Sequence, residues 1–207
     1  MTLTNKVWNI IKFSIYVPFY DFLAILFYKQ RKQSIEMLKP KTDEKILIVG
    51  AGTGLDLMYL KNNRDITAID ITPGMVLMLK LRAKILKLKV KTHIMDGEHL
   101  KFPDNTFDSV ILHLILTVVP HPQKCFAEVY RVLKPDGKII IFDKFLPKDS
   151  KKPIWRKIIN IFVNFIFSDI NIKFEEIFFN NSLTIVEDKN VIWGNFFRII
   201  KIKKNVN

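Results

Sequence analysis

The chain has 207 residues, of which 49% are hydrophobic, and a formal net charge of +13. This length suits one domain with a full core, and the charge favours an anionic partner, either nucleic acid or an acidic membrane surface. A single cysteine, Cys125, excludes an internal disulfide and a cysteine metal cluster and favours a reducing cytosol, and we expect it to be a buried side chain in a helix.

The most apolar segment, residues 7–28, lies near the amino terminus and is interrupted by Lys12, Pro18 and Asp21. A charge within a bilayer is costly and a proline kinks a helix. We therefore expect residues 1–40 to form an amphipathic helical segment that lies on a membrane or caps a pocket. A helix that only covers the core and a true membrane span remain alternatives. A secretory signal is disfavoured, because basic residues follow instead of a small-residue cleavage site.

From residue 45 onward, strand-like and helix-like patterns alternate. This predicts an α/β domain over residues 41–207, with a mainly parallel sheet and helices on both faces. The strands are expected at 45–49, 66–69, 90–95, 109–112 and 138–142, the helices near 54, at 73–88 and at 123–133, and a turn at 134–137.

The first strand runs into three alternate glycines, Gly50, Gly52 and Gly54. Glycine is required where φ is positive or where a ligand approaches the backbone closely, so such a turn predicts a nucleotide-type site. In a dinucleotide fingerprint the third glycine would stand at Leu55, which disfavours a nicotinamide oxidoreductase. A tight turn without a ligand is the plain alternative.

Acids follow the next two strands. Asp70 stands twenty residues after Gly50, at the end of the neighbouring strand, where a carboxylate accepts hydrogen bonds from a ribose diol. Asp96 and Gly97 end the third strand and suit an adenine amino group, with a turn aspartate as the alternative.

The helix expected at 73–88 has an apolar face and a basic face. Its apolar residues at helical spacing are Val76, Leu79, Ala83 and Leu86. The basic residues are Lys80, Arg82, Lys84, Lys87, Lys89 and Lys91. A solvated face is the simplest interpretation, and contact with lipid headgroups or phosphates is the alternative.

These motifs together resemble class I S-adenosylmethionine-dependent methyltransferases over residues 41–145. The resemblance rests on the Val49-Gly-x-Gly-x-Gly turn, Asp70 with residues 72–75, Met95-Asp96, Phe102-Pro-Asp-Asn-x-Phe-Asp108 and Arg131-Val-Leu-Lys-Pro-Asp-Gly137. It implies a Rossmann-like seven-stranded sheet that ends in an antiparallel strand pair, at 183–192 and 196–203, and S-adenosyl-L-methionine as cofactor. It also implies that residues 147–181 are an insertion covering the acceptor. The cofactor-binding residues implied are Tyr20, Gly50, Gly52, Thr53, Gly54, Asp70, Ile71, Met75, Asp96, Gly97 and His113.

Within this family the chain resembles bacterial phosphatidylethanolamine N-methyltransferases in Tyr20-Asp21, Thr117-Val-Val-Pro-His-Pro122 and Phe142-Asp-Lys-Phe145. It departs from them at Asp143 and Lys144, where they carry an asparagine-histidine pair. The resemblance implies methylation of a membrane-associated acceptor, the amine of phosphatidylethanolamine, by an enzyme that is cytoplasmic and peripheral at the membrane. Quinone C-methyltransferases of ubiquinone and menaquinone synthesis are the main alternative.

Two further functions remain open but are disfavoured. A nucleic-acid methyltransferase would fit the charge, but the Asn/Asp-Pro-Pro-Tyr/Phe motif that receives a flipped base is absent after the fourth strand, so no nucleic-acid partner is expected. A membrane protein with an inactive cofactor site conflicts with the intact glycines.

Two side chains could take a proton from the acceptor or orient it. His113 follows the fourth strand and Asp143 ends the fifth, so both should lie at the carboxyl edge of the sheet. A histidine that only fills the pocket wall is the alternative for His113. No metal is expected, because the four histidines show no ligand spacing.

Overall fold

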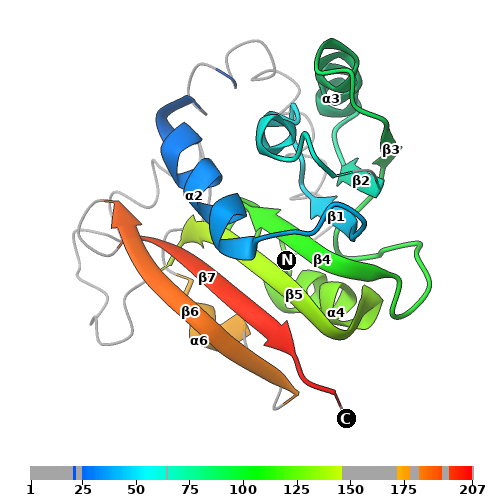
Figure 1. Cartoon of the computed structure of the whole chain (residues 1–207). Coiled ribbons are helices and arrows are strands. Elements are labelled where there is room, and N and C mark those ends of the chain that lie inside the picture. The colour runs from blue at the N-terminus through cyan, green and yellow to red at the C-terminus, as the bar shows by residue number, and fades with distance from the viewer. Residues whose placement is uncertain are drawn as a thin grey trace.

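The computed structural model describes residues 21, 25–63, 65–145, 172–177, 182–192 and 196–206. They form one seven-stranded sheet in the order β3-β2-β1-β4-β5-β7-β6 (Figure 1). The strands are β1 Lys45–Val49, β2 Asp65–Asp70, β3 Val90–Ile94, β4 Phe107–His113, β5 Leu133–Lys144, β6 Leu183–Ile192 and β7 Phe197–Lys204. The helices are η1 Ile25–Phe27, α2 Tyr28–Leu38, η2 Leu55–Tyr59, α3 Pro73–Ile85, α4 Pro122–Val132 and α6 Phe174–Ile177.

The first five strands of the sheet are parallel, whereas β7 pairs antiparallel with both β5 and β6. The predicted mostly parallel sheet and its final antiparallel strand pair are therefore confirmed. The chain order reverses between β1 and β4, and in open α/β sheets such a switch point marks the crevice where ligands bind.

Hydrophobic side chains fill both faces of the sheet. On one face, Cys125, Phe126 and Val129 of α4 are buried together with α6 against β4 and β5. The opposite face carries α2, η2 and α3, whose Leu38 and Leu79 pack over β1 and β2. In Figure 1, α2 lies in front of the sheet, and α4 and α6 lie behind it.

The turn expected at residues 134–137 is present and falls within the span of β5. The five-residue step from Leu133 to Lys138 faces only the two-residue step from Phe107 to Ser109 of β4, and Asp136 has a φ of 62°. Pairing with β4 resumes at Lys138, so the turn interrupts the strand without ending it. One local prediction was wrong, because the helix expected after Gly54 is only the short 3-10 helix η2. Burial of Cys125, in contrast, is confirmed.

The amino-terminal segment is described only at Asp21 and from Ile25 onward. Helix α2 buries Ile35 and Leu38 in the core on the sheet, so this part of the segment covers the core. None of the helices in the described ranges is both long and apolar enough to cross a bilayer. Most of residues 7–28 lies outside the described residues, as does most of the 147–181 insertion.

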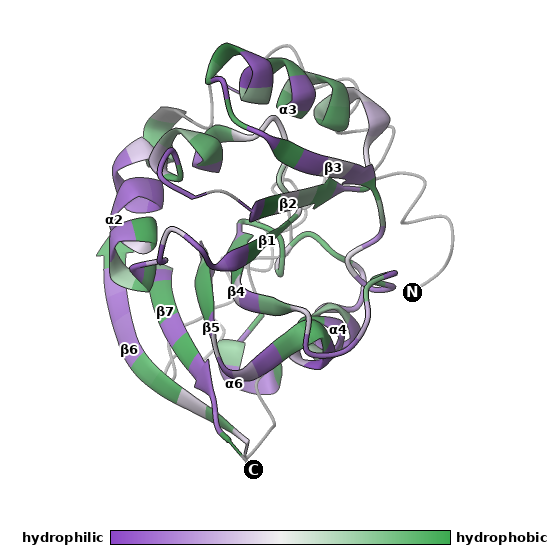
Figure 2. Ribbon diagram, turned by 45° about the vertical axis from the view of Figure 1, so that its right-hand side comes forward, coloured by the Kyte–Doolittle hydropathy of each residue, from purple (hydrophilic) through white to green (hydrophobic). Residues whose placement is uncertain are grey.

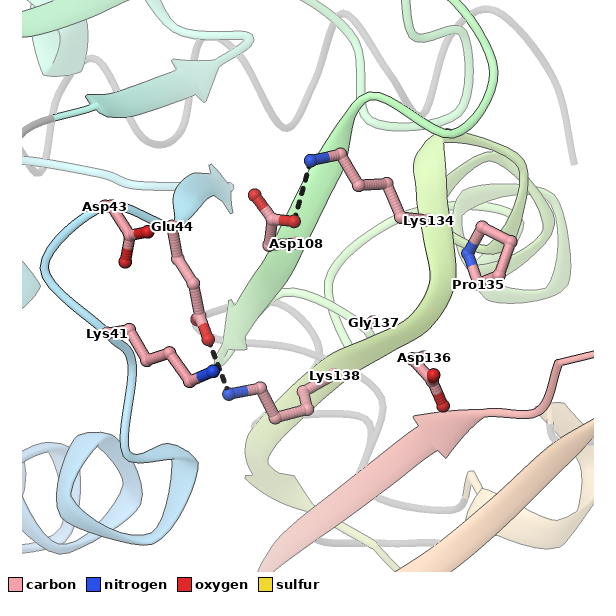
Figure 3. Close-up of a pocket in the computed structure, with 9 residues that line it drawn as sticks. All are labelled: Lys41, Asp43, Glu44, Asp108, Lys134, Pro135, Asp136, Gly137 and Lys138. Atoms are coloured by element: carbon pink, nitrogen blue, oxygen red, sulfur yellow. Dashed lines mark hydrogen bonds and ion pairs between the residues drawn. The ribbon is translucent and has the colours of Figure 1, made fainter.

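A polar hollow of about 410 Å³ opens at the edge where the parallel strands begin. It is lined by Lys41, Asp43, Glu44, Asp108 and residues 134–138, and two ion pairs join four of its charged side chains (Figure 3). Lys134 lies 2.7 Å from Asp108 and Lys138 lies 2.8 Å from Glu44. The glycine turn follows β1 at the opposite edge, so this hollow is remote from the predicted cofactor residues.

Candidate functional site

The glycine turn leaves β1 at the switch point with three left-handed residues. The φ angles of Gly50, Gly52 and Gly54 are 67°, 54° and 83°. A Cβ on Gly50 would lie 2.5 Å from Cδ1 of Ile115, and one on Gly54 would lie 2.5 Å from a Leu79 methyl. Both the conformation and the packing therefore require glycine at these two positions.

Asp70 ends β2 beside this turn. Its Oδ2 accepts a hydrogen bond from the Gly52 amide at 2.8 Å, and its Oδ1 accepts one from the Thr72 amide at 2.9 Å. Burial raises the pKa of this carboxyl, and the two amide hydrogen bonds oppose that rise. Asp70 thus fixes the turn to the start of α3, and its contact with a ribose diol stays a prediction. Of its predicted neighbours, Ile71 is half-buried and Met75 is buried.

Asp96 follows β3, the strand next to β2. The Met95 amide donates to the Asp70 carbonyl at 3.0 Å, so the two acids are held on adjacent chain segments. Gly97 approaches the turn closely, because a Cβ there would lie 2.9 Å from Cγ1 of Val49. The structure thus brings Asp70, Asp96 and Gly97 together around the glycine turn, and this donor and acceptor set fits a nucleoside.

The sequence showed no metal spacing, but the fold brings Asp96, Glu98 and His99 together. One ligand-type atom from each lies within 4.8 Å of the others, the one such group in the described parts of the chain. These atoms already have partners. Asp96 accepts from the Glu98 amide and lies 3.2 Å from Nδ1 of His99, and Glu98 accepts from the His121 amide at 2.9 Å. The group therefore serves as a local hydrogen-bonded turn.

His113 ends β4 and is buried in a polar chain of four side chains. Its Nδ1 lies 2.8 Å from Oδ1 of Asp56, and its Nε2 lies 2.8 Å from Oγ of Ser34. Arg31 donates to both oxygens of Asp56 at 2.8 and 2.9 Å. Burial alone would raise the pKa of Asp56, but the Arg31 guanidinium and His113 hold it well below its usual range.

This chain of groups has the order of a Ser-His-Asp triad, but Ser34 is fully buried and no substrate carbonyl can reach it. The network instead joins helix α2 to η2 and to the end of β4. His113 therefore has both ring nitrogens engaged within this network. Contact of His113 with the cofactor or acceptor stays a prediction.

Asp143 lies at the end of β5 and is fully buried. Its carboxylate accepts hydrogen bonds from the Thr117 hydroxyl at 2.8 Å, the Thr117 amide at 3.2 Å and the Lys144 amide at 2.8 Å. Burial raises its pKa, while the Lys144 charge and the Thr117 hydrogen bonds oppose the rise. Asp143 thus holds the loop after β4 in place, and its predicted role toward an acceptor stays a prediction.

Thr53 connects the glycine turn to two other parts of the chain. Its hydroxyl donates to Asp21 at 2.5 Å, and Arg82 of α3 donates to its carbonyl at 2.7 Å and its hydroxyl at 2.9 Å. Arg82 also forms an ion pair with Asp21. Asp21 of the amino-terminal segment therefore contacts the glycine turn, while the neighbouring predicted ligand Tyr20 lies outside the described residues.

No role in the site was predicted from the sequence for Arg31, Ser34, Asp56 or Ile115, and Arg82 was placed only on the basic face of its helix. The residues that they contact are distant in the chain. Ser34 and His113, for example, are 79 positions apart. One signal was available. Asp56 is an acid in an apolar stretch two residues after the last glycine of the turn, and it is almost completely buried.

Comparison with known proteins is consistent with this geometry. Residues 47–141 match a family described as a methyltransferase domain. The chain is 26% identical over 162 residues to a phosphatidylethanolamine N-methyltransferase of Cereibacter sphaeroides, a match that covers 77% of this chain and 80% of that protein. It is 30% identical over 127 residues to a demethylmenaquinone methyltransferase of Tropheryma whipplei, covering 61% of this chain and 52% of that one. The chain thus spans about half the length of the second relative.

Solved structures support the fold. A SAM-dependent methyltransferase of Thermotoga maritima superposes with a TM-score of 0.68 at 18% identity, covering 96% of this chain and 100% of that one. At this identity the likeness concerns the fold alone.

Proposed function

We propose that this chain, an S-adenosylmethionine-dependent methyltransferase whose family domain spans residues 47–141, methylates the amine of phosphatidylethanolamine. The observation that carries this proposal is the extent of the match to the Cereibacter sphaeroides enzyme, which covers 80% of that protein and reaches well beyond the family domain. The matches to demethylmenaquinone methyltransferases reach 30% identity but cover shorter parts of this chain.

S-adenosylmethionine supplies an activated methyl group on a sulfonium, so the protein has to align the acceptor and exclude water. The residues that would hold it are the glycine turn, Asp70, and Asp96 with Gly97. In the transfer, the amine nitrogen forms a bond to the methyl carbon as the carbon–sulfur bond breaks. The amine must attack in its neutral form, and its proton leaves to a base or to water.

The same edge of the sheet carries His113 and Asp143, whose side chains fix the loop between β4 and α4 and the contact with α2. These two residues therefore shape the acceptor side of the site. In this proposal, the 147–181 insertion covers the acceptor, and residues 1–40 bring the enzyme to an anionic membrane surface.

The experiment presents both candidate acceptors to one enzyme. The full chain is incubated with methyl-labelled S-adenosylmethionine and vesicles that contain phosphatidylethanolamine, demethylmenaquinone, or both. Label in the aminophospholipid is the expected result. Label that enters only the quinone would favour a C-methyltransferase instead, and label in neither would contradict both acceptors.

An Asp70→Ala variant serves as the control for contaminating activity. Because Asp70 accepts from the glycine turn and faces the predicted ribose position, this variant should transfer little label under the same conditions. Transfer at the wild-type rate would mean that the measured activity belongs to another protein in the preparation.

A further inference from the structure

Helix α3 has one face that no part of the described fold covers. Leu77, Leu81 and Ile85 stand four residues apart and are 59%, 47% and 78% exposed. At this spacing the three side chains form a single stripe along the helix. Figure 2 shows hydrophobic and hydrophilic residues side by side on α3 at the outer edge of the molecule. Exposed aliphatic stripes of this kind mark contact surfaces more often than isolated apolar residues do.

The charges around the stripe have one sign. Lys80 and Lys84, both exposed, lie in the row beside it, one residue before Leu81 and Ile85. Neither lysine forms an ion pair with any residue that the structure describes. Residues 71–95 contain six basic residues and no acidic residue, and two of the six, Arg82 and Lys91, pair with acids elsewhere in the chain. Lys80 and Lys84 therefore place positive charge beside the apolar stripe without an ionic partner in the described part of the chain.

We propose that α3 docks side-on onto an anionic lipid surface, with Leu77, Leu81 and Ile85 in the acyl boundary and Lys80 and Lys84 among the headgroups. Aliphatic side chains flanked by lysines match the two zones of a membrane interface. A nucleic-acid surface would make no use of an aliphatic stripe, because phosphates are bound by charged and polar groups.

The position of α3 relates this surface to the site. The helix begins at Pro73, directly after Thr72, whose amide holds Asp70 at the glycine turn. A helix docked side-on therefore has its first turn at the carboxyl edge of the sheet, where the glycine turn lies. In this respect the inference deepens the proposed function, because it names the surface through which the enzyme would reach a lipid acceptor.

The test measures binding of the full chain to vesicles by flotation, without cofactor or acceptor. Vesicles of phosphatidylcholine alone are compared with vesicles that also contain phosphatidylglycerol. The wild type should bind the anionic vesicles and bind less as salt is added. A triple variant, Leu77→Gln, Leu81→Gln and Ile85→Gln, should bind at least about tenfold more weakly. The variant Lys80→Gln with Lys84→Gln should lose about fivefold per lysine.

Matched variants control for composition and charge. Ile185→Gln with Val186→Gln removes exposed apolar side chains from β6, and Lys61→Gln with Lys101→Gln removes two exposed lysines outside α3. Both should bind as the wild type does, and thermal unfolding should show that all variants are folded. Wild-type binding by the triple variant, equal binding to neutral vesicles, or no binding at all would overturn the proposal. The proposal would also be overturned if the double lysine variant lost binding to duplex DNA but kept wild-type binding to vesicles.

The outcome is separable from that of the proposed function. An enzyme that binds anionic vesicles through α3 but leaves phosphatidylethanolamine unlabelled would keep this inference and lose the acceptor. An enzyme that labels detergent-dispersed phosphatidylethanolamine while the triple variant binds vesicles normally would keep the acceptor and lose this inference.

Discussion

The Nδ1 atom of His113 lies 2.8 Å from Oδ1 of Asp56, and both side chains are almost completely buried. Arg31 contacts the same carboxylate from α2, so one aspartate connects three separate parts of the chain. A buried charge that loses its partner destabilises a fold strongly, because the remaining charge stays desolvated.

Asp56→Asn should therefore lower the free energy of unfolding by about 3–5 kcal/mol. Urea denaturation measures this change. Asp65→Asn is the matched control, because Asp65 pairs with the exposed Lys91 and its loss should cost only about 0–1 kcal/mol. Equal effects of the two substitutions would contradict a structural role for the buried network.

The same carboxylate predicts a pH dependence of stability. In the folded chain the pKa of Asp56 lies below its ordinary value of 3.8. A depressed pKa contributes stability that is fully present above the unfolded value and is lost as pH falls through the folded value. The difference in unfolding free energy between the wild type and Asp56→Asn should thus be constant at neutral pH and shrink below about pH 4. A difference that grew on acidification would refute this assignment.

Substitutions in the glycine turn, between β1 and η2, should weaken cofactor binding. Gly50→Ala places a Cβ at a residue with positive φ and against the side chain of Ile115. The affinity for the cofactor should therefore fall, and titration with S-adenosylhomocysteine measures this loss. Adding Ile115→Ala removes the clash but leaves the strained φ, and should restore affinity only in part. Gly74→Ala in the first turn of α3, where no positive φ occurs, should bind as the wild type does. Full rescue by Ile115→Ala would show that the positive φ has no cost.

The sequence predicted the sheet well because its signals are local. Apolar runs that end in glycine or an acid identify β1, β2 and the cofactor turn without knowledge of any partner. The turn at residues 134–137 was also local and was predicted, whereas the pairing of Leu133 with Phe107 of β4 before that turn was not, because it depends on a residue distant in the chain. The network around His113 could not be predicted, since Arg31, Asp56 and His113 meet only after the chain has folded.

Asp70 gives the most direct test of the cofactor site. Asp70→Asn replaces an acceptor by an amide at the position that faces the Gly52 and Thr72 amides. Hydrogen bonds to a charged group are each worth about 1.5–3 kcal/mol, so S-adenosylhomocysteine should bind about 10–100-fold more weakly. Asp65→Asn changes the other end of the same strand and should leave the affinity unchanged. Similar losses in both variants would indicate a general destabilisation of β2.

The contacts of Arg82 indicate that the amino-terminal segment and the glycine turn are energetically coupled. Its guanidinium holds the Thr53 carbonyl and hydroxyl and also pairs with Asp21, so Arg82→Gln should loosen the turn and weaken cofactor binding. Asp21→Asn removes a partner of the same group, so the two effects should not add. A double-mutant cycle of cofactor affinity measures this coupling, which should be about 0.5–3 kcal/mol for groups in one network. Strictly additive losses would mean that Asp21 and Arg82 act independently, and that the contact between the amino-terminal segment and the turn has no effect on cofactor binding.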